Sequence, residues 1–249
     1  MSMDRKIPWP RIAVEGIAIV ASILLAFSID AWWGETQRKN AEQVFLQTLL
    51  DDLQVKQVLL ADMNRFCEAI SESAETLLRV AAGAEQKPAE ETIDRLIVDT
   101  FWVSNEALWD SAPLNLLDAG GSLSLVSNPE LVQELAALEV AIGRVKRHYR
   151  SDRDFHQNIL TPYMIANANM AQISASMTHR PGNPEITITF PDLGFSTTYT
   201  HSELLSSVEF QNILVAKMER LSDILDVGHP GVDEHIVKAI GLLENELGR

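Results

Sequence analysis

The sequence predicts a mainly α-helical protein in which an N-terminal transmembrane helix continues into a long helix of a helical bundle, with one β-hairpin insertion. Three observations predict this fold. Residues 16–29 carry no charge. Residues 35–82 contain neither proline nor glycine, and their apolar side chains recur at spacings of three and four. A stretch near residues 185–200 alternates β-branched and polar residues, as a hairpin does.

Composition limits the class of protein. The chain has 249 residues, with 20 basic and 35 acidic side chains and a net charge of −15. This length suits one domain with an appendage. The acidic balance argues against a nucleic-acid partner, because such binding needs a basic face. The single cysteine, Cys67, excludes an intramolecular disulfide and a cysteine-based zinc cluster. Its place on the apolar stripe of the long helix predicts a small buried side chain.

The N-terminal apolar run predicts a membrane anchor when it is extended to residues 12–33, which span roughly 33 Å as a helix. Trp9 on one side and Trp32 and Trp33 on the other would be the interfacial anchors. A cleaved signal peptide is the alternative, but Glu15 interrupts its apolar core and the helical pattern continues past the cleavage site. We therefore expect residues 1–33 to be a tail and anchor, and residues 34–249 to be a soluble helical-bundle domain.

Basic residues around this run predict its orientation. Arg5, Lys6 and Arg11 precede it, whereas only Arg38 and Lys39 follow closely. The positive-inside rule then predicts a cytoplasmic N-terminus. The expected localisation is the bacterial inner membrane, with a single span and the bulk of the chain outside the cytoplasm.

One face of the predicted span carries two acids and a ladder of small residues: Glu15, Ala18, Ser22, Ala26 and Asp30. Small residues let helices approach closely in a membrane, and ionisable groups turn toward protein there. This face predicts packing against a second copy or against the membrane helix of a partner. In the alternative interpretation, the two acids lie near the headgroups and reach water.

Two stretches carry a resemblance. Residues 14–33, followed by Glu35, Arg38 and Lys39, form a glutamate-led apolar helix that ends in an Ile-polar-polar-Trp signature. They resemble a family of uncharacterised bacterial single-pass membrane proteins, as do residues 107–110 followed by 117–131. Asp30 stands where that family commonly has an amide, and the tryptophan is doubled. The family is a domain of unknown function, so the resemblance implies a topology and no activity.

The rest of the chain predicts further helices separated by turn signals. Asn128, Pro129 and Glu130 form a helix start with a capping residue, proline in the first turn and an acid. We expect the following elements in order: a loop over 83–89, helices over 91–103, 106–118 and 128–171 with a kink or break at Pro162, a hairpin of 185–190 with 195–199, a helix from Ser206 or Ser207 to 227, a break over 228–231 and a last helix.

Catalytic signatures are absent, so we expect neither an enzyme nor a cofactor. The most metal-like arrangement is His148, Asp152 and His156, which share one helical face at a spacing of four. His229, Asp233 and His235 are a second loose set. Neither set matches a specific metal motif, and we interpret these histidines as exposed or capping residues rather than as metal ligands.

One basic concentration stands out in this acidic chain: Arg144, Arg147, Arg150 and Arg153. The simpler interpretation is a solvated helix face that pairs with neighbouring acids. The alternative is a docking patch for an acidic surface, such as that of another protomer.

Together these features predict a membrane-anchored, non-enzymatic bundle that acts as a self-assembling scaffold or as an accessory subunit of a membrane complex. Its expected partners are the bilayer and either further copies of itself or another membrane protein. The alternative function is an extracytoplasmic domain that binds or senses a small molecule and signals through a partner.

Overall fold

The computed structural model describes residues 9–102, 126–176, 178–187 and 200–248, and it is mainly helical. The side chains of residues 9–19 lie outside the description. The elements, in chain order, are α1 (Trp9–Ala81), α2 (Glu90–Thr100), α4 (Pro129–Phe155), η3 (His156–Leu160), α5 (Thr161–Asn167), α6 (Met170–Ala175), β1 (His179–Arg180), β2 (Asn183–Thr187), α7 (Ser202–Ser206), α8 (Val208–Ser222), η4 (Asp223–Gly228) and α9 (His229–Glu246).

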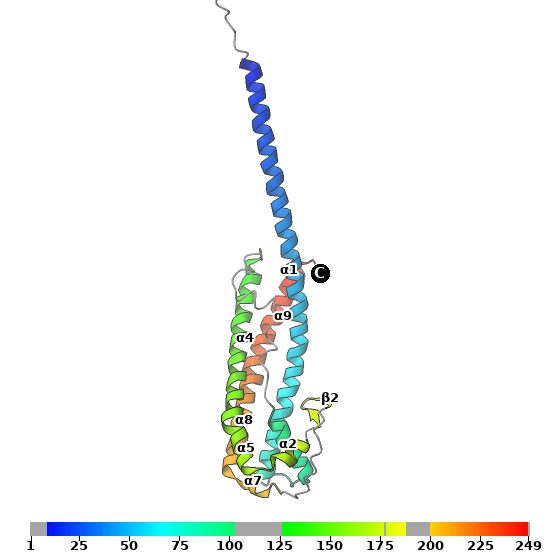
Figure 1. Ribbon diagram of the computed structural model, residues 1–249, viewed down its shortest axis with the longest axis vertical. Coiled ribbons are helices and arrows are strands. Elements are labelled where there is room, and N and C mark those ends of the chain that lie inside the picture. Colours follow the sequence, from blue (N-terminus) through cyan, green and yellow to red (C-terminus); the bar gives the residue numbers. More distant parts are fainter. Residues whose placement is uncertain (1–8, 103–125, 177, 188–199, 249) are drawn as a thin grey trace, which may run out of the picture.

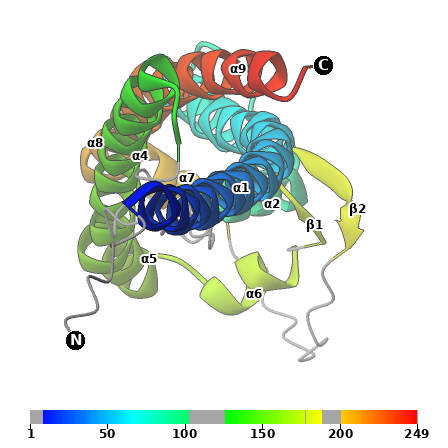
Figure 2. The ribbon, with the colours of Figure 1, turned by 90° about the horizontal axis from the view of Figure 1, so that it is seen from above.

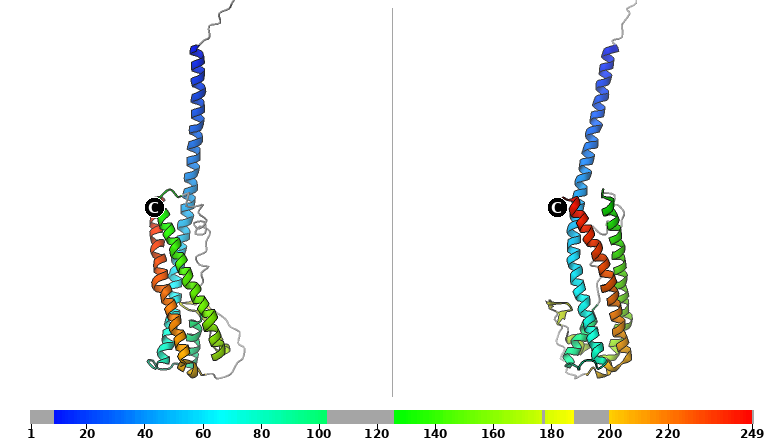
Figure 3. Two further views of the ribbon diagram at one scale, coloured as in Figure 1. Left: turned by 90° about the vertical axis from the view of Figure 1, so that its left-hand side faces the viewer. Right: turned by 180° about the vertical axis from the view of Figure 1, so that it is seen from behind.

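Three long helical rods stand side by side and form the bundle (Figure 1). The first is α1, the second is α4 with η3 and α5, and the third is α8 with η4 and α9. α2 and α7 lie at the end of the bundle where α1 finishes. Seen from above, α1, α4 and α9 surround the core, while β1 and β2 lie outside α1 and α2 (Figure 2). The N-terminal part of α1 extends far beyond the other rods (Figure 3).

α1 confirms the expected unbroken helix and overturns the expected membrane span. Within the residues that the structure describes, no helix has both the length and the apolar character that a membrane crossing requires. The expected single-pass inner-membrane localisation was therefore wrong. The physical reason lies in the sequence: Glu15 and Asp30 bound an uncharged run that is shorter than the roughly 20 residues a bilayer needs. The assignment of residues 1–33 to a tail and anchor and the bilayer as a partner stay predictions.

Two wide helical turns carry the second and third rods past their prolines. Thr161 donates its backbone N–H to His156 O, and His229 donates to Ile224 O, so each bond spans five residues. Pro162 and Pro230 follow directly and have no N–H to donate. At each wider turn the backbone hydrogen bonds already change from a four-residue to a five-residue spacing. The proline, which has no N–H to donate, follows at that point. The predicted break over 228–231 was therefore wrong, and the helix continues through it.

Several predicted helix starts are confirmed by their caps. The Asn128 side chain accepts hydrogen bonds from the backbone N–H groups of Glu130 and Leu131. The Ser207 hydroxyl accepts one from Phe210 N–H and begins α8. α2 covers most of the predicted helix over 91–103. The predicted helix over 106–118 lies outside the described residues.

The core consists of two apolar clusters, and α1 contributes to both. The larger joins α1 to α4 and α9, and it contains Leu49, Leu53 and Cys67, all of which are fully buried. The smaller joins the last turns of α1 to α2, α5 and α8. The expectation that Cys67 is a small buried side chain is confirmed.

The hairpin prediction needs a correction. β2 pairs antiparallel with β1, which precedes it, whereas we expected pairing with residues 195–199. Those residues lie outside the described part of the chain, so that pairing stays a prediction. Gly182 makes the turn between β1 and β2 with φ of +70°, and a Cβ there would lie 2.6 Å from Arg65 O on α1. Arg180 adds an ion pair with Asp62 at 3.0 Å.

Replacing Gly182 with alanine should destabilise the protein because of both its backbone conformation and its contact with α1. Gly83 provides a matched control, since it also has φ of +70° but has open space around its Cα. We expect Gly83→Ala to cost about 1 kcal/mol from left-handed strain alone. Gly182→Ala should cost about 3 kcal/mol, because the overlap with the α1 backbone adds to that strain. Urea unfolding measures both, and equal losses would contradict the close contact.

Candidate functional site

The N-terminal part of α1 forms a projecting segment, which we define as residues 20–41 (Figure 3). Among the described side chains of α1, which begin at Val20, the first buried one is Leu46. Just beyond the segment, the Glu42 carboxylate accepts hydrogen bonds from both the backbone N–H and the hydroxyl of Ser127, which ties α1 to the start of α4. The segment therefore leaves the bundle from a fixed point.

Large apolar side chains of the projecting segment are exposed. Phe27 is 68% exposed, and Trp32 and Trp33 are 65% and 56% exposed. The other members of this set are Val20, Ile23, Leu24, Leu25 and Ile29.

The small and acidic face predicted for the membrane helix lies partly in this segment. Ser22, Ala26 and Asp30 are exposed on it, whereas the side chains of Glu15, Ala18 and Trp9 are outside the description. The roles of Trp9, Trp32 and Trp33 as interfacial anchors stay predictions. What remains is a helix surface whose large apolar side chains are between 50% and 68% exposed.

A buried ion pair replaces the most metal-like arrangement. Lys217 Nζ on α8 donates to both carboxylate oxygens of Asp152 on α4, at 2.7 and 2.9 Å, and to Trp102 O at 2.9 Å. Both charged side chains are fully buried. Burial lowers the pKa of Lys217, while the carboxylate of Asp152 opposes that shift. Asp152 is thus occupied by a cation of the protein itself.

The candidate metal ligands are otherwise dispersed. His148 Nδ1 lies 3.9 Å from an Asp223 oxygen, and His156 contacts the Thr161 hydroxyl. His235 pairs with Glu134 at 2.6 Å. In the part of the chain that the structure covers, no three histidine, cysteine or acidic side chains are placed to hold a metal ion.

His229 joins three helices through a buried polar chain. Its Nδ1–H donates to Asn64 Oδ1 on α1, and Tyr149 on α4 donates its hydroxyl hydrogen to Nε2 at 2.5 Å. Since the amide oxygen can only accept, the ring is the neutral Nδ1–H tautomer. Burial lowers the pKa of His229 to about 4. This histidine is a structural element of the core.

A second buried histidine was missed by the sequence analysis. His201 Nε2–H donates to Asp94 Oδ1 at 2.5 Å, and Gln172 donates to the other carboxylate oxygen at 3.0 Å. Glu90 accepts the His201 backbone N–H and also pairs with Lys87. The partners are more than 70 residues apart in sequence, so no spacing signal reveals them. The cluster fastens α6 and α7 to α2.

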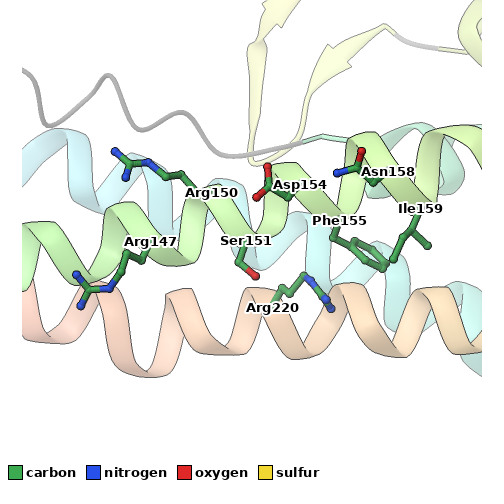
Figure 4. Close-up of a pocket in the computed structure, with 8 residues that line it drawn as sticks. All are labelled: Arg147, Arg150, Ser151, Asp154, Phe155, Asn158, Ile159 and Arg220. Carbon is green, nitrogen blue, oxygen red and sulfur yellow. The ribbon is translucent and has the colours of Figure 1, made fainter.

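An open groove of about 470 Å³ runs along one face of α4 and η3 and is bordered by α8 (Figure 4). Its lining residues are Arg147, Arg150, Ser151, Asp154, Phe155, Asn158, Ile159 and Arg220. Those on α4 and η3 recur at spacings of three and four, which places them on one side of the helix. We call this feature the arginine groove.

The arginine groove brings together only part of the predicted basic patch. Arg147 and Arg150 line it, whereas Arg144 and Arg153 do not. Arg220 of α8 completes it, and sequence reasoning missed this residue because it lies about 70 positions from the others. The guanidinium carbon of Arg220 lies 4.2 Å from the centre of the Phe155 ring, and its Nη1 donates to Ala216 O at 2.7 Å.

Comparisons of the chain with protein-family models, curated proteins and solved structures found no significant match. The resemblance to a family of uncharacterised membrane proteins thus stays a prediction, and the site residues rest on the geometry alone.

The buried ion pair predicts a large penalty for removing one partner. Lys217→Met leaves the Asp152 carboxylate buried without its cation, and we expect it to cost about 3–5 kcal/mol in urea unfolding. The double variant Lys217→Met/Asp152→Val should recover most of that loss, since no charge then remains buried. Lys238→Met is the control, because it breaks an exposed pair with Glu234 and should leave stability unchanged. A double variant no better than the single one would contradict this account.

One buried group, His229, and one half-buried group, Asp99, predict opposite pH dependences of stability. His229 has a pKa lowered to about 4 from 6.5, so the unfolded chain binds its proton first and stability falls as pH drops from 6.5 to 4. The total loss is about 3 kcal/mol for 2.5 pKa units. Burial raises the pKa of Asp99 to about 6 from 3.8, so the folded protein binds that proton first and stability falls as pH rises through this range.

Single variants separate the two effects. His229→Gln should remove the contribution that rises with pH, so its stability falls from pH 4 to 6. Asp99→Asn should remove the contribution that falls with pH and leave a steeper rise than in the wild-type protein. Urea unfolding at intervals between pH 4 and 7.5 measures both. Parallel curves for the wild-type protein and His229→Gln would show that His229 titrates normally.

Proposed function

We propose that this chain is a non-enzymatic helical-bundle protein that self-assembles through the projecting segment of α1. The exposed apolar surface of that segment, with Phe27, Trp32 and Trp33 in it, carries the proposal. Contiguous exposed apolar surface of this extent marks an interaction site in proteins. The segment also continues a helix that is anchored in the core, so it presents this surface in a fixed direction.

The free energy gained by burying the exposed apolar side chains is large enough to support association. Burying one large apolar side chain contributes about 1.5–3 kcal/mol. Burying half of the eight exposed ones would thus contribute about 6–12 kcal/mol, which is comparable with the loss of about 4–15 kcal/mol in translational and rotational freedom on binding. Association becomes favourable when more of this surface is covered.

The distribution of exposed apolar side chains around the projecting segment favours an assembly of more than two copies of the chain. Val20, Leu24 and Phe27 lie on the side opposite Ser22 and Ala26, and Leu25 and Trp32 lie between these two sides, because successive residues are about 100° apart. A dimer covers only one side of such a helix, whereas a coiled-coil bundle of three or more copies covers most of it. We therefore expect an oligomer larger than a dimer.

Larger side chains on the small face, which we define as Ala18, Ser22 and Ala26, test whether copies of the chain pack against each other there. The triple variant Ala18→Leu/Ser22→Leu/Ala26→Leu should reduce the oligomer to smaller species, because leucine prevents close approach on that side. The matched control is Val20→Leu/Ile23→Leu/Phe27→Leu, which changes three residues outside the small face and keeps them apolar. Sedimentation equilibrium of the full chain measures the mass of each.

The outcomes decide between clear alternatives. A monomeric wild-type protein would overturn self-assembly, and loss of assembly in both triple variants would show that the small face has no special role. Stable co-purification of a second polypeptide at fixed stoichiometry would make the chain an accessory subunit instead. Since the chain carries a net charge of −15, raising the salt concentration should strengthen self-association by screening repulsion between copies.

A second candidate function, binding of a small molecule, is favoured by the arginine groove. The groove belongs to the bundle rather than to the projecting segment, so the two functions do not depend on each other.

A further inference from the structure

Three exposed valines mark the outer face of α1 within the bundle. Val44, Val55 and Val58 are 68%, 57% and 70% exposed. They are the only large apolar side chains that α1 exposes over residues 42–81, a range that the structure describes in full. Valine loses side-chain freedom in a helix, so helix propensity does not favour it at exposed positions. Single exposed valines are ordinary, whereas three on one face indicate a contact surface.

These valines continue the small face of the projecting segment. Val44 comes 18 residues after Ala26, which is about five helical turns, and Val58 comes 36 residues after Ser22, which is about ten turns. At about 100° per residue, Val55 and these four residues all lie within about 60° of one another around the helix axis. One exposed face therefore runs from the projecting segment onto the bundle.

The core of the bundle lies on the opposite side of α1. Leu49 and Leu53 are fully buried, and they lie roughly 150–190° around the helix from the valines. The β1–β2 hairpin meets α1 one turn beyond Val58, where Arg180 pairs with Asp62 at 3.0 Å. The exposed face thus begins in the projecting segment and ends at the hairpin.

The unbroken course of α1 determines what covers this face when copies assemble. Two helices packed along residues 20–41 lie about 8–10 Å apart. In a ring of identical copies with cyclic symmetry, the segments are parallel and the same residue of each copy lies at the same level. The next α1 then continues alongside the valines. Parallel coiled coils place β-branched residues such as valine in the seam between their helices.

We propose that the interface between copies extends past the projecting segment onto the bundle, where Val44, Val55 and Val58 of parallel copies pack against one another in register. This inference rests on the proposed self-assembly, and it adds the orientation of the copies and the extent of their contact. The occupant of the exposed α1 face is a second copy of this chain.

Cross-linking of variants with one added cysteine tests the orientation. Val44→Cys and Val58→Cys are each treated with a short bismaleimide reagent, and the wild-type protein is the blank because Cys67 is fully buried. We expect each variant alone to form a covalent dimer. Val140→Cys is the matched control, since Val140 is a 62% exposed valine on α4, and it should stay uncross-linked.

Sedimentation equilibrium of the same variants separates the two proposals. A monomeric protein without cross-links would overturn self-assembly itself. An oligomer that does not cross-link at residues 44 and 58, or cross-links equally at residue 140, would overturn this interface and leave the projecting segment as the contact. Cross-links that form only in a mixture of Val44→Cys and Val58→Cys would show antiparallel packing. Slow labelling of Val58→Cys that dilution does not accelerate would show that the chain itself covers this face.

A charge at the centre of the face tests its contribution to affinity. Val55→Lys should weaken self-association at least about tenfold, because parallel copies would bring their lysines to the same level. Val140→Lys adds the same charge on α4 and should change self-association less than about twofold. Circular dichroism checks that both variants keep their helix content. Equal effects of the two substitutions would contradict the interface.

Asp51 gives a test in the opposite direction. It is exposed on the same face, and its carboxylate accepts a hydrogen bond from Gln47 at 2.6 Å. Packing in register brings each Asp51 near its counterpart, and like charges weaken such a contact. Asp51→Asn should therefore tighten self-association at least about twofold. Glu68→Gln removes an exposed charge of α1 outside this face and is the control. No difference between the two variants would overturn the in-register contact.

Discussion

The unbroken course of α1 is the constraint on which the rest of the structure depends. The helix contributes Leu49 and Leu53 to the larger apolar cluster and Leu77 to the smaller one, so it connects the two halves of the core. The same rod continues through residues 20–41 without a partner in the described chain. A helix fixed at one end by packing stays ordered beyond that packing only as far as its own backbone bonds carry it. The projecting surface therefore follows directly from the core.

Buried polar groups set how the other two rods sit on α1. Lys217 and Asp152 join α8 to α4, and His229 joins α9 to both α1 and α4. Such groups are costly to leave without partners, so they tolerate only the register in which they meet. Apolar contacts alone allow a helix to slide or rotate by small amounts. These polar contacts thus select one arrangement among several that would bury similar area.

The arginine groove depends on that register. Arg220 reaches Phe155 because Lys217, three residues earlier on α8, is fixed to Asp152, three residues before Phe155 on α4. The ion pair and the stacked guanidinium therefore position the same two helix turns. The core contact stabilises the geometry of the groove without lining it, and the projecting segment plays no part in it. One fold carries two separate candidate surfaces.

Local signals in the sequence determined the long helices, the cap at Asn128 and the burial of Cys67, because periodicity and capping act over a few residues. The apolar run before Trp32 led to the expected single-pass localisation, whereas no helix among the described residues has the length and apolar character of a membrane span. Only the tertiary structure decided that Asp152 binds Lys217 and that Arg220 joins Arg147. Those partners lie about 70 residues apart, and no local pattern records which helix faces will meet.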